Sequence, residues 1–108
     1  MADKKNERLI ENTAKYEGSS NGRETSYSVL GVEIVEFSPH ADAQMKMRGI
    51  TEAEVIRALK SPQETGLPTQ IMRQRVRRYR GSKLAVDVVY EMRPDRVIVI
   101  TAILKKFQ

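Results

Sequence analysis

Hydrophobic residues between positions 39 and 60 recur with the spacing of helices rather than strands. They fall one helical turn apart or in adjacent pairs, which places them on one face of each helix. This spacing predicts one helix over about residues 39–48 and a second over about residues 52–60. The apolar positions of the two helices, in chain order, are Ala41, Met45, Val55, Ile56 and Leu59.

Capping residues stand at the ends of the predicted helices. Ser38 is an N-cap residue in front of Pro39, whose missing N–H costs nothing in the first turn. Gly49 is expected to end the first helix, because glycine readily adopts the left-handed conformation found at helix C-termini. Thr51 and Glu54, three residues apart, form a capping box that starts the second helix. Local signals therefore define the whole helix pair.

Alternation of hydrophobic and polar residues predicts strands on both sides of the helix pair. Before the helices, residues 27–37 are rich in β-branched and aromatic side chains, and Leu30-Gly31 is expected to form a bulge or tight turn within them. After the helices, three strands separated by turn-forming residues are expected to form an antiparallel meander. These three strands cover about residues 70–80, 83–92 and 96–104.

The last predicted strand is the most hydrophobic stretch of the chain. Because a strand that is apolar on both faces is usually covered on both, we expect it in the centre of the sheet. Strict alternation would divide its residues between two faces. One face would then hold Val97, Val99, Thr101 and Ile103, and the other Ile98, Ile100, Ala102 and Leu104.

The predicted fold class is α+β, with two short helices packed on one face of an antiparallel β-meander. Residues 26–108 are expected to form this single domain. Residues 1–25 are expected to form a flexible arm or a marginal helix, because the segment 18–22 has the glycine- and serine-rich composition of a linker.

The composition narrows the class of protein. The chain has 108 residues, no cysteine and one histidine, which argues against disulfides, a thiol nucleophile and a zinc site built from cysteine or histidine. No apolar run reaches the roughly 18 residues of a membrane span, and the first 15 residues lack the apolar core of a signal peptide. We therefore expect a cytoplasmic protein with no metal, no cofactor and no membrane partner.

Positive charge is concentrated in one of the predicted strands. The chain carries 19 lysines and arginines against 14 acidic residues, for a net charge of +5. The cluster is either a solvated strand face whose charge keeps a sheet edge soluble, or a phosphate-binding surface for nucleic acid. In the second interpretation, the nucleic-acid-binding residues are Arg73, Arg75, Arg77, Arg80 and Lys83.

The sequence contains no phosphate loop, dinucleotide fingerprint, nucleophile elbow or cluster of metal ligands. One histidine and many arginines are compatible with metal-free cleavage of RNA. In that reaction the RNA supplies its own 2′-hydroxyl nucleophile, and the protein supplies a base, an acid and cations around the phosphate. An imidazole titrates near neutral pH, which suits His40 to either proton-transfer role. The alternative is that His40 only caps backbone groups or packs beside the sheet.

The helix pair resembles a motif of a family of small bacterial and phage-associated domains of unknown function. The resemblance covers about residues 34–104 and includes weaker similarities at Arg78-Tyr79, Gly81, Lys83-Leu84 and Val99-Ile100-Thr101. The family is grouped with the RelE/ParE and BrnT-type toxins, which share an α+β fold and often act as ribonucleases. The helix-pair residues that carry the resemblance are Phe37-Ser38-Pro39-His40-Ala41, Met45, Arg48-Gly49-Ile50-Thr51, Glu54-Val55, Ala58-Leu59 and Pro62.

The resemblance implies a set of catalytic residues. His40 matches the histidine of the family, Arg48 the arginine before Gly-Ile, and Thr101 the hydroxyl residue of the last strand. Arg78 or Arg80 matches the basic strand residue expected near the substrate phosphate of a toxin. The first hypothesis for function is therefore a toxin-like, metal-free ribonuclease.

Gln44 departs from the pattern, because the family usually has an arginine one turn after the histidine. This departure implies a weakened enzyme or a non-enzymatic relative. A second hypothesis is a non-catalytic module that binds RNA, or an acidic antitoxin-like protein, through the arginine-rich strand. A third is an adaptor that forms a homodimer through an exposed sheet edge.

Overall fold

The two helices begin and end at their capping residues. In the computed structural model, which describes residues 22–108, helix α1 spans Pro39–Arg48 and helix α2 spans Glu52–Lys60. The Ser38 side chain accepts a hydrogen bond from the N–H of Ala41, and both hydrogen bonds of the capping box between Thr51 and Glu54 form. Gly49 adopts the left-handed conformation, with a φ of 67°. The predicted helix pair is confirmed.

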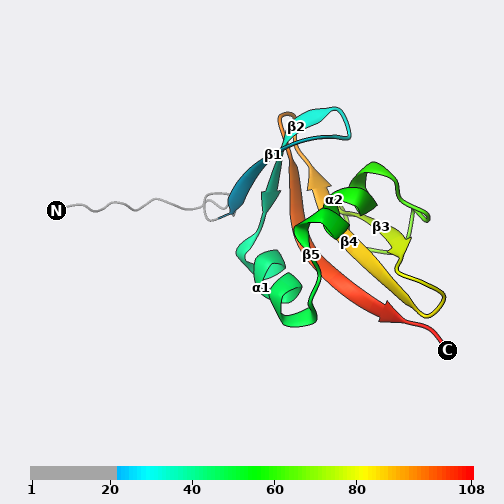
Figure 1. Ribbon diagram of the computed structural model, residues 1–108. Helices are drawn as coiled ribbons and strands as arrows, with labels where there is room; N and C mark the ends of the chain where they lie inside the picture. The colour runs from blue at the N-terminus through cyan, green and yellow to red at the C-terminus, as the bar shows by residue number, and fades with distance from the viewer. Residues whose placement is uncertain (1–21) are drawn as a thin grey trace.

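Five strands form one sheet in the order β1-β2-β5-β4-β3 (Figure 1). Leu30 and Gly31 both have positive φ angles, of 49° and 84°, and form the predicted tight turn between β1 and β2. Strand β5 is the central strand, as its apolar sequence predicts. The strands span Arg23–Val29 (β1), Val32–Phe37 (β2), Gln74–Tyr79 (β3), Leu84–Met92 (β4) and Val97–Lys106 (β5).

One pair of neighbouring strands is parallel, an arrangement that the predicted antiparallel meander did not include. Strand β2 lies parallel to β5, with Val35 opposite Val97 and Phe37 opposite Val99, while the other neighbours are antiparallel. The sheet is therefore mixed. Sequence periodicity identifies strands but carries no information about which strand a distant segment will join, so the meander prediction covered only β3, β4 and β5.

The predicted faces of β5 are wrong, because the strand contains a bulge at Ile100. Val99 pairs with Tyr90 and Thr101 with Val89, so Ile100 has no partner in the register with β4. One extra residue inverts the alternation beyond it. Val97 and Val99 therefore share the helix-covered face with Ala102 and Leu104, not with Thr101 and Ile103.

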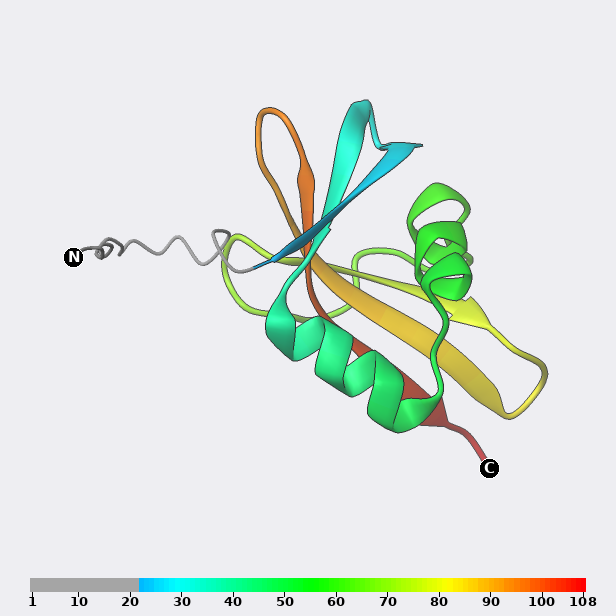
Figure 2. The same cartoon turned by 60° about the vertical axis from the view of Figure 1, so that its left-hand side comes forward.

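Both helices pack on the same face of the sheet, as predicted. Ala41 and Met45 from α1 and the apolar side chains of α2 join one core with strand residues such as Val86 and Val88 of β4. Figures 1 and 2 show α1 beside β5 and α2 over β3 and β4. The opposite face has no helix within the described part of the chain, and we call it the helix-free face.

The ends of the predicted elements differ from the observed ones mainly before β3. The predicted strand at 70–80 begins only at Gln74, and Glu64 contributes a single bridge to Arg77. Strand β1 begins at Arg23, three residues before the predicted domain boundary, and the rest of the predicted N-terminal arm lies outside the described residues. No helix within residues 22–108 is long and apolar enough to span a membrane.

Candidate functional site

The C-terminal half of β5 has one edge without a neighbouring strand. Strand β2 pairs only with Val97–Val99, because β2 ends at Phe37 and the chain turns there into α1. Helix α1 lies along the strand beyond this point (Figure 2). We call the boundary between α1 and residues 99–102 of β5 the α1–β5 seam.

Hydrogen bonds from both ends of α1 hold the seam together. The Ser38 backbone N–H donates to the Val99 carbonyl at 3.0 Å, and the Ser38 hydroxyl donates to the Ile100 carbonyl, also at 3.0 Å. At the other end, Nη1 of Arg48 donates to the Ala102 carbonyl at 3.1 Å. Side chains of α1 thus satisfy carbonyls that a strand would otherwise bind.

His40, Gln44 and Arg48 form a stripe along α1. They are four residues apart, so they lie on one flank of the helix, about 12 Å from end to end at 1.5 Å per residue. His40 and Arg48 are exposed, and Gln44 is half-buried. The Oε1 atom of Gln44 is buried and has no hydrogen-bond partner among the described residues. The stripe therefore presents an imidazole and a guanidinium to solvent beside the seam.

Thr101 lies in the seam through its backbone only. It follows Ile100 and precedes Ala102, whose carbonyls α1 binds, but its pairing with Val89 turns its side chain to the helix-free face. The bulge at Ile100 causes this orientation. The Thr101 hydroxyl therefore does not join His40 and Arg48 on the helix side.

Arg78 lies away from the seam. It pairs with Val86, a core residue, so its side chain leaves β3 on the helix-covered face. Its Nη1 donates to the Ser61 carbonyl at 2.8 Å, at the end of α2. Of the four residues expected to be catalytic, only His40 and Arg48 lie on the same flank of one helix, two turns apart.

The arginines of β3 that point to the helix-free face are paired with carboxylates. Asp87 of β4 has an exposed fraction of 0% and accepts hydrogen bonds from Arg75, at 2.6 and 3.0 Å, and from Arg77, at 2.7 and 2.9 Å. Arg73 pairs with Glu91 at 3.1 Å. These guanidiniums therefore already have anionic partners within the protein.

The ion pairs continue across the helix-free face and the adjoining β4–β5 turn. Arg96 binds Glu36, which is fully buried, and also pairs with carboxylates from β1 and from the turn. The network has at least as many carboxylates as guanidiniums, so the face is not a basic surface. The arginines of this network are Arg73, Arg75, Arg77, Arg93 and Arg96, and the carboxylates are Glu24, Glu36, Glu64, Asp87, Glu91 and Asp95.

Two further pairs perturb ionisation. The Tyr79 hydroxyl donates a hydrogen bond to Glu64, and this bond raises the pKa of Tyr79. Arg80 binds the carboxylate of Glu54 on α2, and this pair lowers the pKa of Glu54 although Glu54 is partly buried. Arg80, which was predicted to bind nucleic acid, is therefore already paired with a carboxylate of the protein.

Four cations without a carboxylate partner in the described part of the chain lie at one end of the molecule. The β3–β4 turn and the end of β5 lie side by side there (Figure 2), and the side chain of Arg80 reaches the Gly49 carbonyl at the end of α1. Register and hydrogen bonding support this, because Leu84 pairs with Lys106 and the Phe107 N–H donates to the Lys83 carbonyl. We call this region the basic end, and its residues are Arg48, Lys83, Lys105 and Lys106.

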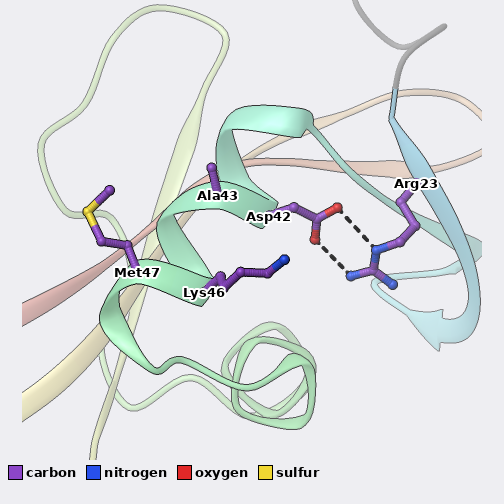
Figure 3. A pocket seen from close by; sticks show the side chains of 5 residues that line it. All are labelled: Arg23, Asp42, Ala43, Lys46 and Met47. Carbon is purple, nitrogen blue, oxygen red and sulfur yellow. Dashed lines mark hydrogen bonds and ion pairs between the residues drawn. The ribbon is translucent and has the colours of Figure 1, made fainter.

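An open pocket of about 770 Å³ lies between the start of β1 and α1 (Figure 3). Arg23 binds Asp42 through two hydrogen bonds, of 2.9 and 3.1 Å, and binds Glu52 of α2 at 2.7 Å. These bonds raise the pKa of Arg23. These bonds connect β1 to both helices and satisfy the positive charge of Arg23 within the protein. Among the described residues that line the pocket, Lys46 is therefore the one cation that could bind a ligand.

A smaller cavity of about 240 Å³ lies between α2 and β3. Arg57, Arg78 and Arg80 line it, together with Glu54. Sequence analysis did not single out Arg57, although its position three residues after Glu54 on α2 would have placed the two on one helix face. Nor did it anticipate that Asp87 would neutralise the arginine-rich strand, although Asp87 follows the polar alternation of β4.

Within residues 22–108, no three acidic, histidine or cysteine side chains lie close enough to hold a metal ion. A family model described as "Domain of unknown function (DUF4258)" matches residues 37–104, which is more than half of the chain. A comparison with curated proteins and a comparison with solved structures found no match. The matched stretch contains the α1–β5 seam and the cavity between α2 and β3.

Proposed function

The chain belongs to the DUF4258 family of domains of unknown function, and from this membership and the geometry of the seam we propose that it is a toxin-like, metal-free endoribonuclease. The observation that carries the proposal is the stripe of His40, Gln44 and Arg48 beside the free edge of β5. An exposed imidazole and an exposed guanidinium on one helix flank supply two of the groups that metal-free RNA cleavage uses, a base and a cation for the phosphate.

In the proposed reaction, His40 acts as the general base. It takes the proton of a 2′-hydroxyl as that oxygen attacks the adjacent phosphorus, and the bond from phosphorus to the 5′-oxygen breaks. Water protonates the departing 5′-oxygen, so the products are a 2′,3′-cyclic phosphate and a 5′-hydroxyl. Arg48 keeps donors free beyond its bond to Ala102 and stabilises the charge on the non-bridging oxygens.

The likeness to RelE/ParE and BrnT-type toxins supports the proposal at the level of fold. The likeness rests on the helix-pair motif, and it implies an α+β domain in which a helix pair covers a sheet. The chain has two strands, two consecutive helices and a three-stranded meander in that order. The toxin-like description belongs to the proposal, since a shared fold does not by itself transfer an activity.

Replacing His40 with alanine tests the proposal. We expect the wild-type protein to cleave single-stranded RNA in EDTA, and the His40→Ala variant to be slower by about 10²–10⁴-fold, the usual contribution of a general base. The variant should keep the thermal midpoint of the wild type, because His40 is exposed. The measurement is the rate of cyclic-phosphate formation on a labelled oligonucleotide.

Lys46→Ala is the matched control, because Lys46 is an exposed residue of the same helix outside the stripe. It should cleave at the wild-type rate. Equal cleavage by wild type and a folded His40→Ala variant would overturn the assignment of the base. Absence of cleavage by the wild type, in every buffer that supports RNA binding, would overturn the ribonuclease proposal itself.

A second candidate function is RNA binding without cleavage. Two observations favour it: Gln44 in place of the family arginine, and the unpaired cations of the basic end. The same cleavage assay distinguishes the two candidates, because a binding module retains oligonucleotide affinity while producing no cyclic phosphate. An acidic antitoxin-like protein remains the corresponding proposal for a protein partner of the basic end.

A further inference from the structure

The cavity between α2 and β3 contains cationic groups that the proposed chemistry does not use. Helix α2 supplies Glu54 and Arg57, β3 supplies Arg78, and Arg80 follows directly after β3. Its volume of about 240 Å³ is below the 300–1,000 Å³ typical of drug-sized ligands, so it suits a small group. Its lining is mostly charged side chains, which favours an ionic ligand over an apolar one.

One arginine of the cavity is fixed by internal bonds. Nε and Nη2 of Arg80 donate to the two carboxylate oxygens of Glu54 at 2.7 and 2.9 Å, and Nη2 also donates to the Gly49 carbonyl at 2.9 Å. This bidentate pair is electrically neutral. It forms a rigid wall of the cavity and leaves the net charge of the cavity to the other arginines.

The two remaining arginines are not neutralised. Arg78 uses Nη1 to bind the Ser61 carbonyl, which carries no net charge, so its positive charge and its other donors remain available. Arg57 has no ion pair or side-chain hydrogen bond with any residue of the described chain, 22–108. Two arginine forks without carboxylate partners therefore line one small cavity.

We propose that this cavity is a phosphate-binding site in which Arg57 and Arg78 bind the phosphate oxygens. The planar guanidinium fork matches the geometry of phosphate, and a phosphate group supplies the negative charge that these two side chains lack. If the proposed ribonuclease function holds, on which this part of the inference rests, the phosphate belongs to the RNA backbone. If that function fails, the ligand is a free phosphate compound.

The contacts of Arg80 connect this cavity to the α1–β5 seam. Arg80 binds the Gly49 carbonyl, and Gly49 directly follows Arg48, the last residue of the α1 stripe. A single RNA strand held at Arg48 would therefore meet the cavity by passing over Gly49. On this path the cavity binds a phosphate that flanks the cleaved one, and so determines which nucleotides lie at His40.

The test is a titration of the full chain, followed by NMR of the arginine Nε–Hε groups. The probes are inorganic phosphate and a single-stranded oligouridylate with 2′-O-methyl groups, which cannot be cleaved because the nucleophile is blocked. Both should shift the signals of Arg57 and Arg78. Arg78→Gln should weaken phosphate binding about tenfold, which corresponds to loss of one charge-assisted hydrogen bond.

Arg93→Gln is the matched control, because it removes the same charge from an exposed arginine of the β4–β5 turn. It should bind both probes as the wild type does. Thermal midpoints of both variants show whether loss of the Ser61 contact has disturbed the fold. Arg57 and Arg78 signals that stay unchanged with both probes, or equal phosphate affinity in Arg78→Gln and Arg93→Gln, would overturn the site.

The remaining outcomes separate this site from the ribonuclease proposal. Shifts with inorganic phosphate but not with the oligonucleotide would support a site for a free phosphate compound and overturn the RNA path. Phosphate and oligonucleotide binding that needs Arg78, in a protein that cleaves nothing, would support the site while the ribonuclease fails. Cleavage that needs His40, without any phosphate binding at Arg57 and Arg78, would remove the site alone.

Discussion

Asp87 is the residue on which the helix-free face depends. Its carboxylate has an exposed fraction of 0%, and Arg75 and Arg77 bind it from the neighbouring strand with four hydrogen bonds. Removing one member of a buried ion pair leaves the other charges uncompensated in a low-dielectric environment. The network therefore tolerates loss of a peripheral charge far better than loss of this central one.

Asp87→Asn should lower the free energy of unfolding by about 3–5 kcal/mol, because two guanidiniums would remain beside a neutral amide. The measurement is urea denaturation, compared at the transition midpoint. Asp95→Asn is the matched control, since Asp95 pairs with Arg96 but its side chain is 63% exposed, and it should shift the transition midpoint far less than Asp87→Asn does.

The pH dependence of the same pair of proteins checks the cause. Burial raises the pKa of Asp87, but the hydrogen bonds from Arg77 and Arg75 outweigh it, so the pKa lies below the ordinary value of about 3.9. The contribution of Asp87 is therefore present above about pH 4 and is lost as the pH falls through the folded-state pKa. A stability difference between wild type and Asp87→Asn that persisted undiminished at lower pH would contradict the ionic explanation.

At the scale of elements, the bulge in β5 decides which side chains face the helices. Ile100 has no partner on β4, so the residues before and after it follow opposite alternations. The bulge brings Ala102 and Leu104 to the core and also presents the Ile100 carbonyl to Ser38 of the helix start. The bulge therefore positions both the core and the seam.

Deletion of Ile100 should destabilise the protein by about 1–3 kcal/mol, because it removes the carbonyl that the Ser38 hydroxyl binds in the seam. The two faces of β5 should stay as they are, because Val99 and Thr101 already pair with the adjacent residues Tyr90 and Val89 of β4. Urea denaturation gives the measurement. Ile100→Val keeps the residue count and should cost only about 0.5–1.5 kcal/mol. Equal stability of the two variants would show that the bulge is dispensable.

The two helices were predicted correctly because the residues that define them are close to each other in the sequence. The determinants of α1 and α2, namely Ser38, Gly49, Thr51 and Glu54, all lie within a residue or a turn of the boundary they define. No distant contact is needed for these caps to act. The β5 bulge, by contrast, has no local signal in a continuous apolar run, and only pairing with β4 and capping by Ser38 reveal it.

At the scale of the whole molecule, the helix-free face and the basic end differ in how their positive charges are paired. The arginine-rich helix-free face is internally paired, whereas the basic end has cations without a carboxylate partner in residues 22–108. A polyanion such as RNA gains most binding free energy from cations that do not first have to break an ion pair within the protein. We therefore expect RNA to bind at the basic end and along the helix side, not across the arginines of β3.

Salt dependence of RNA binding measures this distribution. The double variant Lys83→Gln/Lys105→Gln should reduce the slope of log K against log salt by about 1.4, at about 0.7 per lost phosphate contact with a single strand. Arg73→Gln/Arg93→Gln removes the same charge from two arginines that both pair with Glu91, and should leave the slope nearly unchanged. The reverse order of effects would place the RNA on the helix-free face.

Local signals in the chain were sufficient for the helix pair, the Leu30-Gly31 turn, the three C-terminal strands and the central position of β5. Each follows from periodicity, capping or turn chemistry, which act between residues close in sequence. They also placed His40 and Arg48 on one helix, because the spacing of the two residues is a property of that helix alone.

Only contacts between distant residues decided the rest. The parallel pairing of β2 with β5, the orientation of Thr101 and the separation of Arg78 from the seam all depend on strand register. The pairing of charges also depends on distant contacts, because Arg75 and Arg77 become ion-paired only when the fold places Asp87 between them. A sequence shows which charges a chain has, but the tertiary structure determines which of them remain unpaired.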